Sequence, residues 1–353
     1  MRIGELCSYA PKSTIKAGEA VDGAKYMFFT SSADESKRYT EYQYDGEGII
    51  MGTGGNATLH YYSGKYAVST DCVVLVPRGN IRCKYLYYYL KANMTVLEAG
   101  FKGAGLKHTN KKYISDIDVN TVPDFCKQDE IIAILDKLNA VINSRKEELQ
   151  LLEDLVSARF VEMFGDPDVN EYNWEIYKIE QLCDVGSSKR IYQNEQSRIG
   201  IPFLRVSDLV NRMDTGSKES DLYIPESRFE ELKKQGLVPK SGDILLTARG
   251  TLGRCYIIQD DDEFYFQDGM ITWLSKYDAK VIPLYISYLF EMPGFRKQID
   301  SLQAGSTVAY LSIYMTKKLD IMLPPIKLQN QFADFVKEVD KSKVRQQKYT
   351  YKI

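Results

Sequence analysis

The chain has 353 residues, of which 44% are hydrophobic, and its formal net charge at pH 7 is −2. This length and apolar content are enough for two ordinary hydrophobic cores. So small a net charge argues against a general nucleic-acid coat protein, although a local basic face would still bind DNA. The sequence has neither an N-terminal apolar segment nor a run of about 18 apolar residues, so we expect no signal peptide and no membrane span.

Cysteine and histidine usage narrows the possible chemistry. The cysteines are scattered without a CxxC pair, and the only histidines are His60 and His108. We therefore expect a reduced, cytoplasmic protein with no metal site and with little material for histidine-based catalysis. The six cysteines are Cys7, Cys72, Cys83, Cys126, Cys183 and Cys255.

Residues 1–122 are predicted to form a first globular module. Strand-like runs rich in β-branched and aromatic residues occur at Met27–Thr30, Gly48–Met51 and Tyr66–Val76. Apolar residues at helical spacing predict a helix over Ile81–Leu97. Pro123-Asp124 then interrupts the chain and marks the end of the module.

Residues 123–166 are predicted to form a long central helix, running from Gln128 to Met163. Its apolar residues alternate in steps of four and three, and this 3.5-residue period is typical of a coiled-coil seam. Arg145 and Arg159 interrupt the seam, and Gly165 ends the helix. The seam residues are Ile131, Leu135, Leu138, Ile142, Leu149, Leu152 and Val156.

Residues 167–323 are predicted to form a second module, and residues 324–353 a second helix that starts near Lys327 after Pro324-Pro325. Phe332, Val336 and Val339 continue the seam pattern in this helix. Two narrow apolar seams in one chain most simply bury each other. If the helices run antiparallel, a pseudo-twofold axis relates the two modules.

The second half of the chain repeats the first, with an insertion between Asp208 and Lys240. We therefore expect a mixed α+β fold, in which two similar α/β modules are separated by an antiparallel two-helix coiled coil. Modules that share an apolar framework but differ in their loops are suited to reading two different targets at a fixed separation. The aligned segments are Arg2–Cys7 with Lys178–Cys183, Gly48–Met51 with Asp243–Leu246, and Ile131–Leu138 with Phe332–Val339.

The motifs that would indicate catalysis are missing. Gly52–Asn56 and Gly100–Gly105 lack the full dinucleotide or P-loop pattern, which favours tight β-connections at both places. A methyltransferase that flips adenine needs an Asn/Asp-Pro-Pro-aromatic loop, and Leu323–Ile326 has neither the polar residue nor the aromatic one. No carboxylate cluster with a lysine stands out as a nuclease site. We therefore expect no chemistry from this chain itself.

Polar loops after the repeated strands are the candidates for reading DNA bases. Asn and Arg are natural bidentate partners of adenine and guanine edges. For any single residue, a solvated loop is the simpler interpretation. The candidates are Thr53, Asn56 and Lys65, with Thr247, Arg249, Thr251 and Arg254 in the second module; Lys102, Lys107, His108 and Thr109, with Ser306, Thr307 and Tyr310 opposite; and Lys189, Arg190, Arg205 and Ser207.

Several of these segments resemble one family. Leu155–Pro167 resembles the central conserved region of specificity subunits of type I restriction-modification systems, and Leu323–Phe332 resembles the start of their second conserved helix. Tyr26–Ser32 and Ile201–Val206 resemble motifs of their target-recognition domains. The resemblance covers the whole chain in the family's order of recognition domain, helix, recognition domain, helix.

The resemblance implies a non-catalytic subunit that reads duplex DNA, one half of a bipartite site per recognition domain. The helices would set the unread spacer and dock two methyltransferase subunits, which use S-adenosylmethionine. Restriction subunits, which need ATP and Mg, would bind through the methyltransferase subunits. This chain itself would hold no cofactor and would not contact a membrane. The second helix is short for the family, which leaves open a compact form, a truncation or a coil completed by another molecule.

Two other classes of function remain open from the sequence. A catalytic methyltransferase or nuclease would act without partners, and a methyl-transfer assay on the isolated chain would detect it. A coiled-coil scaffold would use its modules to bind protein or non-duplex nucleic acid. Salt-dependent binding that is indifferent to sequence would favour that scaffold.

Overall fold

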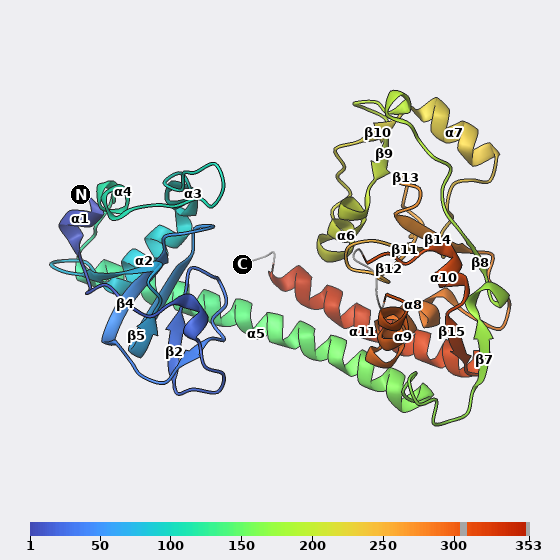
Figure 1. Cartoon of the computed structure of the whole chain (residues 1–353), viewed down its shortest axis with the longest axis horizontal. Helices are drawn as coiled ribbons and strands as arrows, with labels where there is room; N and C mark the ends of the chain where they lie inside the picture. Colours follow the sequence, from blue (N-terminus) through green and yellow to red (C-terminus); the bar gives the residue numbers. More distant parts are fainter. Residues whose placement is uncertain (304–308, 351–353) are drawn as a thin grey trace. The chain divides into compact units, whose positions relative to one another are not determined.

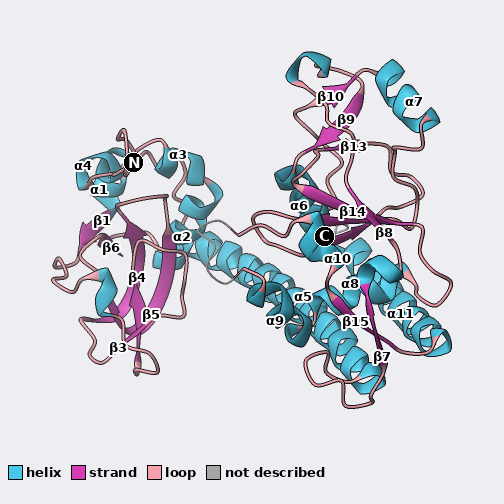
Figure 2. Ribbon diagram, turned by 45° about the vertical axis from the view of Figure 1, so that its right-hand side comes forward, coloured by secondary structure: helices cyan, strands magenta, loops and turns pink. Residues whose placement is uncertain are grey.

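The computed structural model describes residues 1–303 and 309–350. It divides into two compact units, Met1–Ser144 (unit 1) and Arg145–Ile353 (unit 2). Both units mix helices and strands (Figures 1 and 2), so the predicted α+β class is confirmed. The boundary lies within the long helix α5 (Phe125–Phe164), because each half of this helix packs on the core of its own unit.

Unit 1 is built on one six-stranded sheet with the order β1-β6-β4-β5-β2-β3. Its strand pairs are antiparallel except for β2 and β5, which run parallel. The elements are α1 (Ile3–Leu6), β1 (Cys7–Tyr9), η1 (Ala17–Glu19), β2 (Tyr26–Phe29), β3 (Arg38–Tyr39), β4 (Tyr44–Gly52), β5 (Leu59–Val68), β6 (Cys72–Pro77), α2 (Cys83–Ala92), α3 (Met94–Glu98), α4 (Lys111–Asp116) and the first part of α5.

Side chains alternate across the sheet of unit 1 and fill a core on each face. On β4, Ile49 and Met51 pack with Leu86 of α2, whereas Ile50 points to the other face and packs with Phe29 and Tyr66. This alternation follows from the two-residue period of a strand. The sheet is therefore buried on both sides, with α2 covering one of them.

Unit 2 has the same connections, but its main sheet is split. The strands form a four-stranded sheet β12-β11-β14-β8, a three-stranded sheet β10-β9-β13 and the pair β15-β7. The elements after α5 are β7 (Glu175–Lys178), η2 (Ile179–Gln181), β8 (Asp184–Gly186), η3 (Gln193–Glu195), β9 (Ile201–Leu204), α6 (Val206–Thr215), β10 (Tyr223–Ile224), α7 (Glu226–Lys234), β11 (Ile244–Thr247), β12 (Cys255–Ile257), β13 (Tyr265–Phe266), β14 (Ile271–Ser275), α8 (Pro283–Glu291), α9 (Pro293–Ser301), α10 (Ile313–Lys317), β15 (Asp320–Leu323) and α11 (Ile326–Thr350).

The split occurs in the strand that corresponds to β5. In unit 1, β5 pairs antiparallel with β4 and parallel with β2. In unit 2 these two pairings belong to separate strands, because β12 pairs antiparallel with β11 and β13 pairs parallel with β9. Asp262 lies between β12 and β13 and forms a buried ion pair of 2.8 Å with Arg212 of α6. The inserted helix α6 is thus anchored at the break.

The repeat extends to individual ion pairs. Arg2 forms an antiparallel bridge with Asp118 in unit 1, and the charged groups lie 3.9 Å apart. In unit 2, Lys178 and Asp320 are partners in the β7–β15 pair, with charged groups 2.6 Å apart. Both pairs close a module by joining its first residues to its last, just before the long helix.

Within unit 2, α5 and α11 pack against each other in antiparallel orientation. The Phe160 and Phe332 rings lie 5.5 Å apart, and the Lys343 ammonium lies 3.9 Å from the carboxylate of Glu153. Residues near the start of α11 therefore contact the end of α5, and residues further along α11 contact positions nearer the start of α5. Arg159, which interrupts the seam, places its guanidinium 5.8 Å from the centre of the Phe335 ring.

The seam residues have different surroundings along α5. Val156, Phe332, Val336 and Val339 lie in the core of unit 2, and Leu152 packs against it. Ile131 packs against the core of unit 1. Leu135, Ile142 and Leu149 are half-buried, and Leu138 is 37% exposed. In unit 1, α5 faces the polar side of α2, not an apolar helix, and this leaves Leu138 in contact with solvent.

The polar contacts between α5 and α2 centre on Asp136. Lys84 approaches its carboxylate to 2.7 Å, and the hydroxyl of Tyr88 donates a hydrogen bond to it. Asn139 donates a further hydrogen bond of 3.1 Å to the Tyr88 hydroxyl. The hydrogen bonds from Lys84 and Tyr88 lower the pKa of Asp136 against the opposing effect of burial, so the carboxylate stays ionised at this interface.

A fully buried glutamine in the first turn of each long helix makes the same three hydrogen bonds in both units. Gln128 accepts from the backbone N–H of Arg82 at 2.7 Å and donates to the carbonyls of Asn80 and Pro123. Gln329 accepts from the backbone N–H of Ile282 at 3.0 Å and donates to the carbonyls of Lys280 and Pro324. Arg82 and Ile282 are the N-cap residues of α2 and α8. We call Gln128 and Gln329 the glutamine clamps.

Two of the predicted elements are each two elements in the structure. The helix expected over Ile81–Leu97 breaks at Asn93, whose side chain donates a hydrogen bond of 2.7 Å to the carbonyl of Tyr89. The strand expected over Tyr66–Val76 breaks at a turn in which the N–H of Cys72 donates to the carbonyl of Ser69. In both cases a local hydrogen bond competes with the regular element.

Replacing one of the clamp glutamines should greatly destabilise the unit that contains it and leave the other unit unaffected. Gln329→Leu removes all three hydrogen bonds and leaves buried backbone groups without partners, so we expect unit 2 to lose about 2–4 kcal/mol. Both tryptophans, Trp174 and Trp273, lie in unit 2. Urea unfolding followed by tryptophan fluorescence therefore measures this unit.

The matched control is Gln331→Leu, an exposed glutamine on the same helix, for which we expect a change below about 0.5 kcal/mol. Gln128→Leu should leave the tryptophan transition unchanged and lower the stability of unit 1, as seen by circular dichroism. Equal shifts for the Gln329 and Gln331 variants would refute the clamp.

Candidate nucleic-acid interface

In unit 1 the structure joins two candidate loops that the sequence predicted separately. The N–H of Gly55 donates to the carbonyl of Lys107 at 2.9 Å, and the N–H of Thr109 donates to the carbonyl of Thr53 at 3.0 Å. Gly54 and His108 are bridge partners between these bonds. A side chain at position 54 would come within 3.2 Å of the His108 ring, so glycine lets the two loops approach. We call this pairing the loop pair of unit 1.

The second loop of unit 1 is a short hairpin. Lys102 and His108 exchange two backbone hydrogen bonds of 3.0 Å, and the turn between them contains Leu106, which is 69% exposed. Lys102, Lys107 and His108 are exposed, as is Asn56 on the neighbouring loop. This edge of unit 1 therefore presents cationic and amide groups to solvent.

Unit 2 builds the equivalent loop pair at the positions that the repeat aligns. The N–H of Leu311 donates to the carbonyl of Ala248 at 3.0 Å, which matches the bond between Thr109 and Thr53. Arg249 and Tyr310 are bridge partners, as Gly54 and His108 are in unit 1. The guanidinium of Arg249 lies 5.2 Å from the centre of the Tyr310 ring.

Three candidate threonines belong to the framework of the loops: Thr109 and Thr247 are buried, and Thr53 is half-buried. Thr247 is fully buried, and its hydroxyl donates to the carbonyl of Thr251 and accepts from the N–H of Arg254 at 3.0 Å. The Thr53 hydroxyl donates to the carbonyl of Asp71 at 2.8 Å, and Thr109 is only 8% exposed. Because these hydroxyls are enclosed or engaged, their side chains are not free to contact DNA in this structure. Thr251 itself is exposed.

Most of the other cationic candidates are paired with carboxylates. Arg254 forms an ion pair of 2.7 Å with Asp214 of α6, and the hydrogen bond from Arg254 lowers the pKa of Asp214. The remaining pairs are Arg190 with Asp268 at 2.8 Å, Arg205 with Asp208 at 3.0 Å and Asp221 at 3.3 Å, and Lys65 with Asp45 at 4.0 Å.

Two further candidates lie beside these pairs, and two cannot be placed. Ser207 is exposed and donates a hydrogen bond of 3.4 Å to Asp208, and Lys189 is exposed beside the hydroxyl of Tyr265. Ser306 and Thr307 lie outside the described residues. Among the exposed or half-buried candidates of the unit 2 loop pair, the structure therefore gives positions for Arg249, Thr251 and Tyr310.

The sequence did not reveal the residues that support the loop pair of unit 2. Gln303 accepts from the N–H of Tyr310 at 2.8 Å and donates to its carbonyl at 3.2 Å. Arg296 of α9 donates to the carbonyl of Leu252 at 2.6 Å. These residues follow no local motif, and only the fold brings them to the loop.

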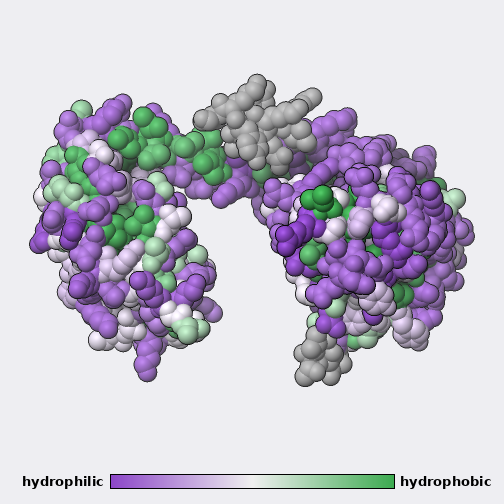
Figure 3. Space-filling model, turned by 90° about the horizontal axis from the view of Figure 1, so that it is seen from above, coloured by the Kyte–Doolittle hydropathy of each residue, from purple (hydrophilic) through white to green (hydrophobic). Residues whose placement is uncertain are grey.

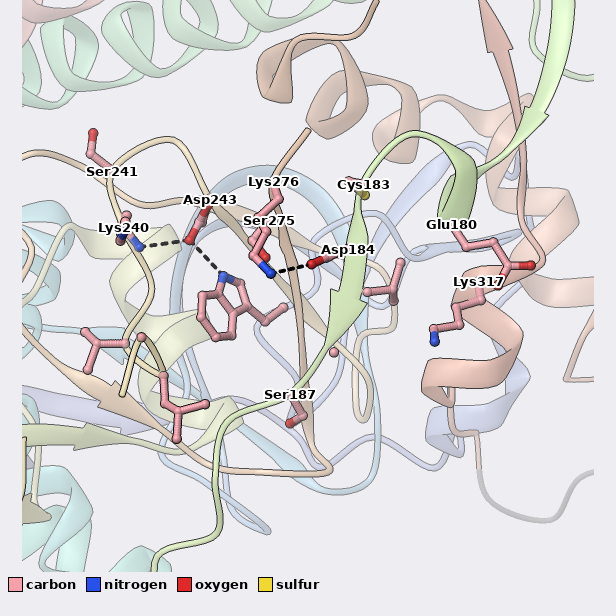
Figure 4. A pocket seen from close by; sticks show the side chains of 16 residues that line it. Glu180, Cys183, Asp184, Ser187, Lys240, Ser241, Asp243, Ser275, Lys276 and Lys317 are labelled. Carbon is pink, nitrogen blue, oxygen red and sulfur yellow. Dashed lines mark hydrogen bonds and ion pairs between the residues drawn. The ribbon is translucent and has the colours of Figure 1, made fainter. Parts of the chain in front are cut away.

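A hollow of about 770 Å³ lies elsewhere in unit 2 (Figure 4). Asp243 accepts hydrogen bonds of 2.9 Å from the backbone of Lys240 and from the indole of Trp273, and Lys276 pairs with Asp184 at 2.7 Å. None of the DNA-binding candidates lines it. Its charged groups largely neutralise one another, which sets it apart from the exposed loop pair.

Three other features of the described residues bear on function: the reactivity of the cysteines, the grouping of possible metal ligands and the apolar content of the helices. Burial raises the pKa of the Cys7, Cys72, Cys83 and Cys183 thiols to about 12, so these are poor nucleophiles at neutral pH. In residues 1–303 and 309–350, no group of three or more His, Cys, Asp or Glu side chains is arranged to hold a metal ion. None of the helices in the described part of the chain has the length and apolar content needed to cross a bilayer.

Two modules that share strand pairings and a loop pair, but differ in their exposed loop residues, define a tandem-repeat protein of the recognition type. A family model described as the type I restriction modification DNA specificity domain matches residues 1–154 and again residues 171–350. The chain therefore belongs to the type I restriction-modification DNA specificity family. The resemblance indicated by the sequence motifs is confirmed.

Individual relatives agree with this assignment. A putative type I restriction enzyme specificity subunit of Haemophilus influenzae is 29% identical over 86% of this chain and 78% of its own length. The specificity subunit of the type I restriction enzyme MjaVIII of Methanocaldococcus jannaschii is 24% identical over 83% of this chain and 72% of its own. The S subunit of a type I restriction-modification system from M. genitalium has a similar fold, with a TM-score of 0.61 at 13% identity, over 100% of this chain and 91% of that one.

The buried threonine of the unit 2 loop pair predicts a stability effect. Thr247→Val keeps the shape of the side chain but removes both hydrogen bonds of the hydroxyl, so we expect unit 2 to lose about 1–3 kcal/mol. Thr251→Val, four residues away and exposed, should change stability by less than about 0.5 kcal/mol. Tryptophan fluorescence during urea unfolding measures both. A stable Thr247→Val protein with altered base preference would instead mean that this hydroxyl reaches DNA.

Proposed function

We propose that the chain is the non-catalytic, DNA-reading subunit of a type I restriction-modification complex, and that each module reads one half of a bipartite, asymmetric duplex site. The loop pairs support this proposal most directly. A matching backbone hydrogen bond and a matching bridge join the two loops in both units, while the bridge partners differ: Gly54 and His108 in one unit, Arg249 and Tyr310 in the other. A shared framework with different side chains reads different base pairs.

The proposal assigns methyl transfer and DNA cleavage to partner subunits. The chain lacks the Asn/Asp-Pro-Pro-aromatic loop that holds a flipped adenine. The partners would be two methyltransferase subunits, which use S-adenosylmethionine, and restriction subunits, which use ATP and Mg. The chain itself would hold no cofactor.

The long helix offers a surface on which a partner could dock. On the part of α5 that lies in unit 2, Leu151 is 66% exposed and Leu155 is 48% exposed. These leucines are four residues apart and therefore share one face of the helix. Figure 3 shows hydrophobic atoms at several places on a surface that is largely hydrophilic, and two exposed leucines on one face of a helix are suited to a protein contact.

The first test measures methyl transfer. We expect the purified chain to transfer no methyl group to DNA, and to direct adenine methylation to one bipartite sequence when it is combined with a cognate methyltransferase subunit. Methylated adenines would be mapped by long-read sequencing of DNA treated with the chain, the methyltransferase, or both.

The three outcomes of this test are distinct. Methylation by the chain alone would contradict the non-catalytic role. Methylation by the pair at a sequence with only one specified part would contradict the two-reader model. Methylation by the pair without any sequence preference would contradict the specificity role and favour the coiled-coil scaffold.

The exposed lysines of unit 1 predict how binding depends on salt. Lys102→Ala combined with Lys107→Ala removes two cations that stand free of ion pairs among the described residues. If both contact phosphates, affinity falls similarly for every sequence, and the slope of log K against log salt decreases in magnitude by about two. Fluorescence anisotropy over a salt series measures the slope. The control is Lys12→Ala with Lys16→Ala, an exposed pair in the same unit; equal slopes for both double variants would reject the phosphate contacts.

A further inference from the structure

Arg249 occupies a defined position in the loop pair of unit 2. It is exposed and follows β11 after one buried residue, Ala248. Its backbone is a bridge partner of Tyr310, and its guanidinium lies over the Tyr310 ring at 5.2 Å from the centre. The backbone of Tyr310 is held in turn by the two hydrogen bonds to Gln303. The arginine thus projects from a hydrogen-bonded backbone and lies beside the ring of a residue whose backbone is also held.

Arg249 also differs in charge balance from the other candidate arginines of unit 2. Arg190, Arg205 and Arg254 each have a carboxylate within 3.3 Å. Arg249 has none within ion-pair distance among the described residues. Its guanidinium nitrogens are therefore open to a ligand, whereas those of the other three are already engaged.

An arginine in this state suits one kind of DNA contact. The planar guanidinium donates two parallel hydrogen bonds to the O6 and N7 atoms of guanine in the major groove, which is the commonest specific contact of arginine with DNA. Stacking on an aromatic ring orients the plane beforehand and reduces the side-chain entropy lost on binding. Loss of a phosphate contact, which arginine also makes, would instead weaken binding to every DNA sequence alike.

We propose that Arg249 reads the guanine of one G·C base pair in the half-site recognised by unit 2, and that Tyr310 is the positioning residue for its guanidinium. The proposal rests on the DNA-reading function proposed above. In unit 1 the equivalent positions are Gly54 and His108, so unit 1 has no arginine there. The proposal therefore places a guanine preference that depends on this arginine in the half-site of unit 2 and not in that of unit 1.

The test is selection of bound duplexes from a randomised DNA library with the full-length chain, followed by sequencing. We expect the wild type to select two half-sites, one with a preferred G·C pair that Arg249→Ala alone erases. The preference for that pair should fall by about 5- to 150-fold, with every other position and the second half-site unchanged. Tyr310→Phe should keep the preference, and Tyr310→Ala should weaken it at the same base pair.

The matched control is Arg198→Ala, at an exposed arginine of unit 2 outside the loop pair, which should leave the selected sequence unchanged. An unchanged profile for Arg249→Ala would overturn the proposal. So would a uniform loss of affinity, which indicates a phosphate contact, or a loss of unit 2 stability without a positional change, which indicates a structural role. If the wild type selects no sequence, the proposed function itself fails, and this result differs from a bipartite site that ignores Arg249.

Discussion

The arrangement of each module depends on the glutamine clamp that joins it to its long helix. Gln128 and Gln329 are fully buried, and each satisfies one backbone donor and two backbone carbonyls. The donor is the N-cap of α2 or α8, the helix that covers the sheet. Because an unpaired amide in a core costs several kcal/mol, a shift of these elements that breaks the bonds to the glutamine is strongly opposed. The sheet, its covering helix and the long helix are therefore held as one body in each unit.

In both units, the groups that hold the loops in place differ from the side chains that the loops expose to solvent. The bonds between the paired loops join backbone atoms, and the hydroxyls of Thr53 and Thr247 bond to backbone groups that support the loops, so neither set depends on which side chains are exposed. The residues at the bridge positions can then differ, as the buried Gly54 and the exposed Arg249 do. A specificity subunit needs this separation, because its loops must change with the DNA sequence while its fold and docking surfaces remain constant.

Unit 2 departs from unit 1 where the insertion meets the sheet. The strand equivalent to β5 is divided into β12 and β13, and the gap is bridged by the buried Arg212–Asp262 pair. The hydroxyl of Tyr256 donates to the same carboxylate, and burial together with that bond raises the pKa of Tyr256 to about 12. A buried pair with these extra hydrogen bonds replaces strand pairing that the insertion removes. It also places α6 so that Asp214 can hold Arg254.

The sequence alone determined the repeat, the two long helices, the mixed fold class and the family, because periodicity and aligned motifs are properties of the chain itself. It also located Arg249 and Tyr310 as candidates. Only the tertiary structure distinguished the enclosed Thr247 and the ion-paired Arg254 from the open Arg249, because burial and charge pairing depend on residues far apart in the chain. The division of the unit 2 counterpart of β5 into β12 and β13, the exposed Leu138 and the support from Gln303 were hidden for the same reason: long-range contacts override local patterns.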